Sequence, residues 1–143
     1  MSDINKNLLY SKIHFDLLLK LYKFSVNEFS TNSSIYELFT VIATEGLNID
    51  RASYWEINNH NLSCVDLFDK NKNKHFKEGV LNSIDLPIYF NALKDGIAIV
   101  ADNVLTNKYT SELKDDYLIP LGITDMLDIP IRKVWRISWC FLL

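Results

Sequence analysis

Two neighbouring runs decide the fold of this chain: Arg51-Ala52-Ser53-Tyr54-Trp55-Glu56-Ile57 and Leu62-Ser63-Cys64-Val65-Asp66-Leu67-Phe68. Both are rich in the aromatic and branched residues that favour strands, and turn-forming asparagines separate them. We therefore predict an antiparallel hairpin. Tyr54 and Trp55 lie on opposite faces of a regular strand, so one of them should pack on helices and the other toward a pocket side.

Two helices are predicted before the hairpin. Residues 5–29 have apolar positions at helical spacing, and a second apolar stripe through Leu9, Ile13 and Leu17 suggests a partner beyond the domain. Residues 35–45 form the second helix, whose apolar face is made of Ile35, Leu38, Phe39, Ile42 and Ala43. Ser34 and Glu37 have the spacing of a capping box, and Gly46 can supply the left-handed residue at its end.

Shorter elements follow the hairpin. The lysine-rich run 70–74 is predicted as a solvated loop, and Pro87 should start a helix over 88–94. Residues 97–101 are a continuous apolar run, as expected of a strand covered on both faces. The remaining predictions are a short helix over 110–117, a turn at 120–122 and a strand over 124–132.

This order of elements predicts an α+β fold (an α/β sandwich), in which helices cover an antiparallel sheet. A length of 143 residues fits one domain. We divide it into a helical pair (5–45), sheet and pocket segments (51–133) and an atypical tail (134–143).

Composition excludes several functional classes. A net charge of −3 argues against broad nucleic-acid binding. No apolar run is long enough to span a bilayer and no secretory signal is evident, so we expect a cytoplasmic protein without a membrane partner. Cys64 and Cys140 are too few and too isolated for a disulfide framework or a zinc site, and we interpret them as buried reduced thiols.

Five segments, taken in order, resemble GAF domains attached to bacterial sensor histidine kinases and diguanylate cyclases. They lie within 34–133: Arg51-Ala52-Ser53-Tyr54-Trp55, Asp66-Leu67-Phe68, Pro87-Ile88-Tyr89-Phe90-Asn91-Ala92-Leu93, Ala101-Asp102-Asn103 and the run from Tyr117 to Arg132. The resemblance implies a central antiparallel sheet with a helical pair on one face, which often dimerises. On the other face it implies a pocket formed by short helices and loops.

The resemblance also implies a sensory or signal-relaying function coupled to an output module. In many GAF domains the pocket holds a cyclic nucleotide, a tetrapyrrole or another small molecule, whereas for many others no ligand is known. Fold likeness transfers no ligand, so the cofactor stays unknown and the pocket has to be argued from its residues.

Nine side chains lie on or beside the segments that close this pocket, and aromatic walls with a few polar anchors are typical of ligand sites. The same tyrosines and phenylalanine are equally good core residues. The candidates are Tyr54, Cys64, His75, Tyr89, Phe90, Asp102, Tyr109, Tyr117 and Asp125.

Three polar residues each have an alternative interpretation. His75 could anchor an anion or titrate near neutral pH, but we favour an exposed loop histidine. Asp102 could accept a hydrogen bond from a ligand, although we favour a role in capping the following turn. Asp128 lies in an apolar run and needs a partner, for which Arg51 and Arg132 are candidates.

No catalytic or metal-binding constellation stands at a recognisable spacing, so we expect no enzyme activity. A ligand-free structural dimerisation module is the main alternative to a sensor. Free methionine sulfoxide reduction, known in a GAF-fold family, needs two thiols within reach. A covalent bilin site needs a cysteine beside the pocket, commonly next to a histidine. Neither cysteine of this sequence neighbours a histidine. The signature of cyclic-nucleotide-binding GAF domains is not evident either.

The resemblance stops at Lys133, and the tail from Val134 to Leu143 departs from the glycine-containing final strand of the family. Codons read one base out of frame restore that pattern, because Trp135 and Trp139 are each followed by residues that force a glycine in the shifted frame. We therefore hypothesise that the tail is a frameshifted product, which sequencing of the source DNA tests. A divergent native tail, whose residues also favour a strand, is the alternative.

Overall fold

The computed structural model describes Lys12, Phe15, Asp16 and Leu19 and the ranges 32–58, 60–133 and 136–142. The four described residues of the N-terminal segment are helical. The rest of the predicted 5–29 helix, including Leu9, Ile13 and Leu17, lies outside the described residues.

A seven-stranded antiparallel sheet forms the centre of the fold. The strand order is β3-β2-β1-β7-β6-β5, and β4 pairs with the other end of β2. The bounds are β1 (Arg51–Asn58), β2 (Asn61–Asp69), β3 (Lys74–Phe76), β4 (Val80–Asn82), β5 (Ile99–Ala101), β6 (Met126–Lys133) and β7 (Arg136–Leu142).

The predicted hairpin is confirmed as β1 and β2. Its register runs from Arg51 opposite Asp69 to Asn58 opposite Asn61, with a bulge where Tyr54 faces Asp66 and Trp55 faces Cys64. Two short strands follow β2 that the sequence did not predict, because each has only three residues and takes its stability from pairing with β2.

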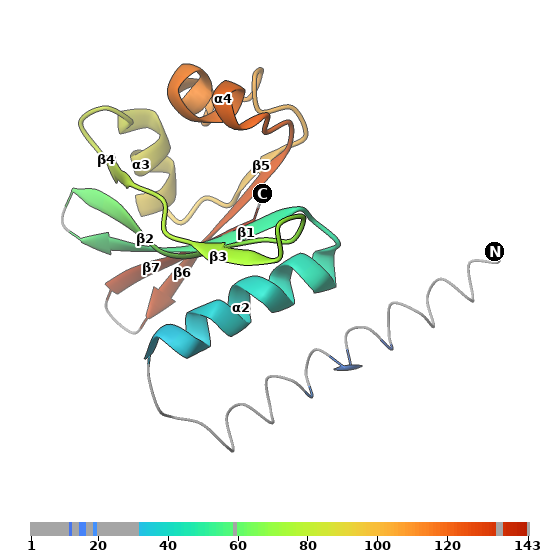
Figure 1. Ribbon diagram of the computed structural model, residues 1–143. Coiled ribbons are helices and arrows are strands. Elements are labelled where there is room, and N and C mark those ends of the chain that lie inside the picture. The colour runs from blue at the N-terminus through green and yellow to red at the C-terminus, as the bar shows by residue number, and fades with distance from the viewer. Residues whose placement is uncertain are drawn as a thin grey trace.

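Helices cover both faces of the sheet, which confirms the α+β fold class (Figure 1). The long helix α2 (Asn32–Leu47) lies on one face. The opposite face carries α3 (Pro87–Lys94), the 3₁₀ turn η1 (Ser111–Leu113), the π-helical turn η2 (Lys114–Leu118) and α4 (Ile119–Leu121).

The structure corrects three details of α2. It begins at Asn32, so Ser34 lies inside the first turn and not at the predicted cap. The left-handed residue after it is Asn48, with a φ of 52°, and not Gly46. Its most buried side chains are Thr40 and Thr44, whereas the predicted apolar face is only partly covered.

The strand predicted over 97–101 is shorter and less covered than expected. Only Ile99–Ala101 form β5, which pairs with β6 alone and ends the sheet. Ile99 and Ala101 are buried, but Val100 between them is 62% exposed. The apolar run therefore belongs to an edge strand with one covered face.

The C-terminal third also departs from the predicted elements in part. The helix predicted over 110–117 is a 3₁₀ turn followed by a π turn, and Pro120 belongs to α4, which ends at the left-handed Gly122. In the atypical tail, Arg136–Leu142 form β7 between β1 and β6. A strand here fits a divergent native tail but does not test the source DNA, so the frameshift stays a hypothesis.

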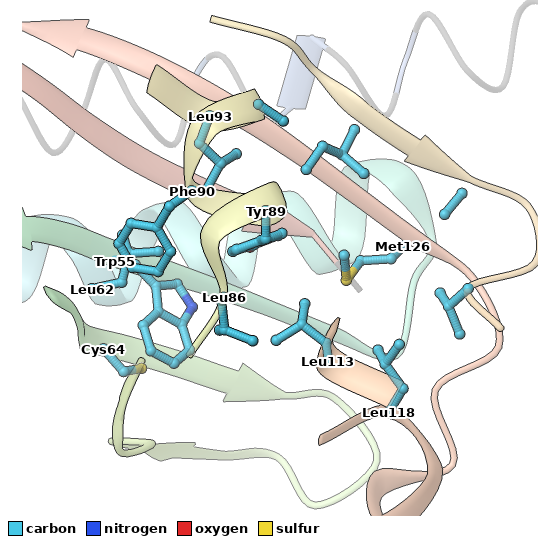
Figure 2. Packing of buried hydrophobic residues seen from close by; sticks show 14 of the residues in the cluster. Trp55, Leu62, Cys64, Leu86, Tyr89, Phe90, Leu93, Leu113, Leu118 and Met126 are labelled. Atoms are coloured by element: carbon cyan, nitrogen blue, oxygen red, sulfur yellow. The ribbon is translucent and has the colours of Figure 1, made fainter. Parts of the chain in front are cut away.

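One continuous hydrophobic core lies between the sheet and α3, with side chains from η1, η2 and β6 closing it (Figure 2). Phe90 and Leu93 of α3 point toward Trp55 and Leu62 of the central hairpin. The helix α3 starts at Pro87, as the sequence predicts, and the left-handed Gly96 follows it. This packing positions α3 over the candidate site.

Candidate functional site

A small cavity lies between the sheet and the short helices on the face opposite α2. Its volume is about 10 Å³, which is room for about one water molecule. Residues of β1, α3, η1, η2 and β6 surround it, together with one from β4: Ser53, Trp55, Leu81, Tyr89, Leu113, Tyr117, Met126 and Asp128.

Asp128 is the chemically unusual member of this cavity. Its side chain is 1% exposed, and Oδ2 accepts a hydrogen bond of 2.8 Å from the hydroxyl of Tyr89. Its Oδ1 is buried without a hydrogen-bond partner among the described residues. Burial raises the pKa of this carboxyl to about 8, against which the Tyr89 hydrogen bond acts, so the group is mainly neutral at pH 7.

The partner of Asp128 corrects the prediction. The sequence suggested Arg51 or Arg132, because a buried carboxylate usually needs a cation. Instead the carboxyl is paired with Tyr89, which is 39 positions away on α3. Burial also raises the pKa of the Tyr89 hydroxyl well above its usual range, and the neighbouring Asp128 adds to this effect. Both groups are therefore protonated at neutral pH.

A carboxylate from η1 fixes the start of α3 above the cavity. The first turn of α3 has no side-chain cap of its own at Leu86. Glu112 supplies one from a distance: its two oxygens accept hydrogen bonds from the backbone N–H groups of Ile88 (3.1 Å) and Tyr89 (3.0 Å). The orphan donors of a helix N-terminus favour an anionic acceptor. Glu112 thus ties η1 to the helix that carries Tyr89.

Glu78 joins two further elements beside the cavity, β1 and η2. Its Oε2 accepts a hydrogen bond of 2.6 Å from the Tyr117 hydroxyl, and its Oε1 lies 2.6 Å from Nη2 of Arg51. Burial raises the pKa of Tyr117 far above its usual range, and Glu78 raises it further. The hydroxyl is therefore a permanent donor to this carboxylate.

Two of the nine predicted site residues face the other side of the sheet. Tyr54 stacks on Tyr36 of α2, with ring centroids 4.3 Å apart. His75 lies in β3, and not in the predicted loop, with Nδ1 3.0 Å from both carboxylate oxygens of Asp66. Thr40 of α2 donates a hydrogen bond of 2.5 Å to Asp66. These contacts join the sheet to α2, so neither residue lines the cavity.

Three further candidates have structural positions. Cys64 and Phe90 are buried in the core, and burial raises the pKa of the Cys64 thiol to about 11. That thiol is not a nucleophile at neutral pH. Tyr109 packs against the rim of the core, and the ammonium group of Lys108 lies 4.5 Å from its ring centroid.

The two aspartates lie at the surface. Asp102 is exposed, and the following turn is capped by Asn103, whose Oδ1 accepts a hydrogen bond of 3.0 Å from the N–H of Leu105. Asp125 is exposed and accepts a hydrogen bond of 2.6 Å from Thr124. Both line an apolar surface groove of about 260 Å³ beside β5.

Of the nine predicted residues, only Tyr89 and Tyr117 line the cavity. The sequence did signal Asp128, as a carboxylate that required a partner. It gave no signal for Glu78 or Glu112, because their partners are reached through loops and turns whose positions depend on the whole fold.

The described residues hold neither a metal-binding cluster nor a helix that could cross a membrane. They contain no cluster of three or more histidine, cysteine, aspartate or glutamate side chains that could hold a metal ion. None of their helices combines the length and the apolar character that crossing a membrane requires.

Comparisons with known proteins bear on the fold. No protein-family model and no curated protein matches the chain. Among solved structures, the GAF domain of A. aeolicus nlh2 in an inactive state is 14% identical, with a TM-score of 0.62, over 92% of this chain and 78% of that one. A far-red cyanobacteriochrome photoreceptor is 15% identical, with a TM-score of 0.50, over 94% and 80%. These likenesses show that the chain has a GAF-like fold.

Proposed function

We propose that this chain is a regulatory sensory domain, which binds a small molecule above the sheet and relays the change to an output module. The observation that carries the proposal is the buried Asp128 carboxyl, one of whose oxygens has no partner in the described part of the chain. An unsatisfied buried polar atom costs about 1–3 kcal/mol, and a bound molecule would remove that cost.

The surroundings of Asp128 suit a hydrogen-bonding ligand. Aromatic side chains from three elements surround the carboxyl: Trp55, Tyr89 and Tyr117. Because the carboxyl is mainly neutral at pH 7, it can donate as well as accept a hydrogen bond. A ligand larger than water must displace η1 and η2, and such an opening couples binding to a change in shape.

The relay runs through β1, whose residues contact both layers. Ser53 and Trp55 line the cavity, whereas Tyr54 between them stacks on Tyr36 of α2. The neighbouring strand adds the hydrogen bond from Thr40 of α2 to Asp66. A shift of β1 on binding would therefore move the helix on the opposite face.

The remaining features of the proposal follow the resemblance. We propose a cytoplasmic domain without catalytic activity, whose output module is of the histidine kinase or diguanylate cyclase type. We also propose that it forms a homodimer through its N-terminal helices. The high pKa of the Cys64 thiol argues against a methionine sulfoxide reductase, which needs a reactive thiolate.

A ligand-free dimerisation module is the second candidate function. The observation that favours it is the small size of the cavity, about 10 Å³, because ligand pockets usually measure hundreds of cubic ångströms. In this case the carboxyl of Asp128 would hold one water molecule. The two candidates make opposite predictions about ligand-dependent stability.

Thermal unfolding separates the two functions. Cyclic GMP, biliverdin and the free amino acids serve as probes, and native mass spectrometry of protein purified from cells detects a retained molecule. A sensor should show a rise in Tm with at least one probe, or a retained mass, and the effect should be lost in Asp128→Ala. No shift and no retained mass would leave the structural module as the function.

A further inference from the structure

The guanidinium group of Arg51 is only partly used by its neighbours. Nη2 lies 2.6 Å from Oε1 of Glu78, but Nε is buried without a partner among the described residues. The N–H of Nε and one N–H of Nη2 point in the same direction, so together they match the two oxygens of one carboxylate. Glu78 accepts from Nη2 with one oxygen and from the Tyr117 hydroxyl with the other, so this carboxylate leaves Nε unused.

Arg51 is also reachable from outside. It lies in a groove of about 660 Å³ at the start of β1, between the loop after α2 and the turn that follows α4. On the sheet, Arg51 alternates with Ser53 and Trp55 and shares their face, where the Asp128 cavity lies. Arg51 of the groove and Tyr117 of the cavity wall are joined by the carboxylate of Glu78, which contacts both side chains.

The segment that carries Glu78 lies outside the strand pairing of the sheet. Residues 77–79 belong to neither β3 nor β4. The next residue, Gly79, has open space on the side where a side chain would stand. Moving this carboxylate aside breaks two side-chain contacts and disturbs no strand pairing.

We propose that Arg51 and Tyr117 form a binding site for a small-molecule carboxylate, which the side chain of Glu78 occupies in this structure. The incoming carboxylate takes both Nε and Nη2 of Arg51 and the hydroxyl of Tyr117, and Glu78 moves into the groove. The bound carboxylate would then lie beside the cavity of Asp128, because Tyr117 lines that cavity as well. The inference rests on the proposed sensory function and names the chemical class of its ligand.

The test measures the binding of malonate, succinate and glutarate by calorimetry, with each diamide as the neutral control. Glu78→Gln removes the competing charge and should strengthen binding of the preferred diacid by about tenfold, the scale of one charge-assisted hydrogen bond. Glu37→Gln removes the same charge from an exposed position of α2, on the other face of the sheet. It should leave the affinity for the diacid unchanged. Arg51→Gln should abolish binding.

Two further measurements keep the test independent of misfolding. Tyr117→Phe keeps the ring and should weaken binding several-fold, while Lys94→Gln on the exposed end of α3 should leave it unchanged. In the unchanged protein, the NMR signal of the Arg51 Nε–H should move on addition of the diacid and not of the diamide.

Failure of this inference can be told apart from failure of the sensory function. If no diacid binds even to Glu78→Gln, or if diacid and diamide bind equally, the carboxylate site is wrong. An equal response to inorganic phosphate would also overturn it. In each of these cases a neutral molecule retained at Asp128 would still support sensing.

Discussion

At the scale of single residues, Asp128 gives the structure a built-in dependence on pH. Its pKa is about 8 in the folded chain, whereas an exposed aspartate titrates near 4. Between these values the folded state holds a proton that the unfolded state lacks. Stability is therefore highest at the acid end of this window and falls as the pH rises toward 8.

The first prediction concerns Asp128→Asn, which keeps the shape of the neutral carboxyl and cannot ionise. The native chain should lose up to about 1.4 kcal/mol of unfolding free energy per pH unit through this group between pH 5 and 8. The variant should lack this contribution. Its stability relative to the native chain should therefore be higher at pH 8 than at pH 5. Urea unfolding at the two pH values measures the difference.

An exposed aspartate provides the control for this prediction. Asp95→Asn changes the same residue type at an exposed position after α3 and should leave the slope of stability against pH unaltered. Identical slopes in the native chain and in Asp128→Asn would contradict the assignment of the high pKa to Asp128.

The residue scale also shows what the sequence could predict of the site. The demand of Asp128 for a partner was readable, because a carboxylate between apolar neighbours in a strand is exceptional. The identity of the partner was not readable. The sequence argument assumed a cation, but burial favours the neutral acid, and a neutral acid is satisfied by the hydroxyl of Tyr89.

At the scale of elements, the attachment of η1 to α3 depends on Glu112. Replacing Glu112 with alanine leaves the N–H groups of Ile88 and Tyr89 without their acceptor. We expect a loss of about 1 kcal/mol of unfolding free energy, the usual effect of removing a helix cap. Hydrogen exchange at these two amides should accelerate, while exchange in β1 should change little.

Two variants separate capping from the loss of charge. Glu112→Gln keeps an oxygen acceptor and should lose less stability than alanine. Asp115→Ala removes a neighbouring exposed carboxylate from η2, for which no capping contact is seen, and should be nearly neutral. Equal losses in Glu112→Ala and Asp115→Ala would show that the cap is not the cause.

Local sequence signals predicted some elements well and others poorly. The β1–β2 hairpin and α3 were readable, because alternating aromatics, turn residues and Pro87 act over short distances. The strands β3 and β4 were not, since three residues carry too little pattern. The buried face of α2 was also misjudged, because its most buried residues, Thr40 and Thr44, are polar. Their hydroxyl groups can be buried because they form hydrogen bonds inside the protein.

At the scale of the whole molecule, the outer surface of α2 carries exposed apolar side chains beside two glutamates. Phe39 is 38% exposed and Leu47 is 51% exposed, although α2 packs on the sheet with its other side. Uncovered apolar side chains on a helix favour contact with another surface. The second apolar stripe in the sequence of 5–29 adds to this argument, because both segments adjoin in the chain. Together they support a two-fold contact between copies.

The last prediction tests this contact by analytical ultracentrifugation. The native chain should sediment as a homodimer, and the combined replacement of Leu9, Ile13 and Leu17 by glutamate should give a soluble monomer. Phe39→Glu should weaken the dimer, since a charge there cannot be desolvated cheaply. Glutamate in place of Val100, a more exposed apolar residue on the edge strand β5, should leave the dimer intact. A dimer that survives the triple replacement but is lost on changing Val100 would place the contact at the sheet edge, and the relay through α2 would then lack its output surface.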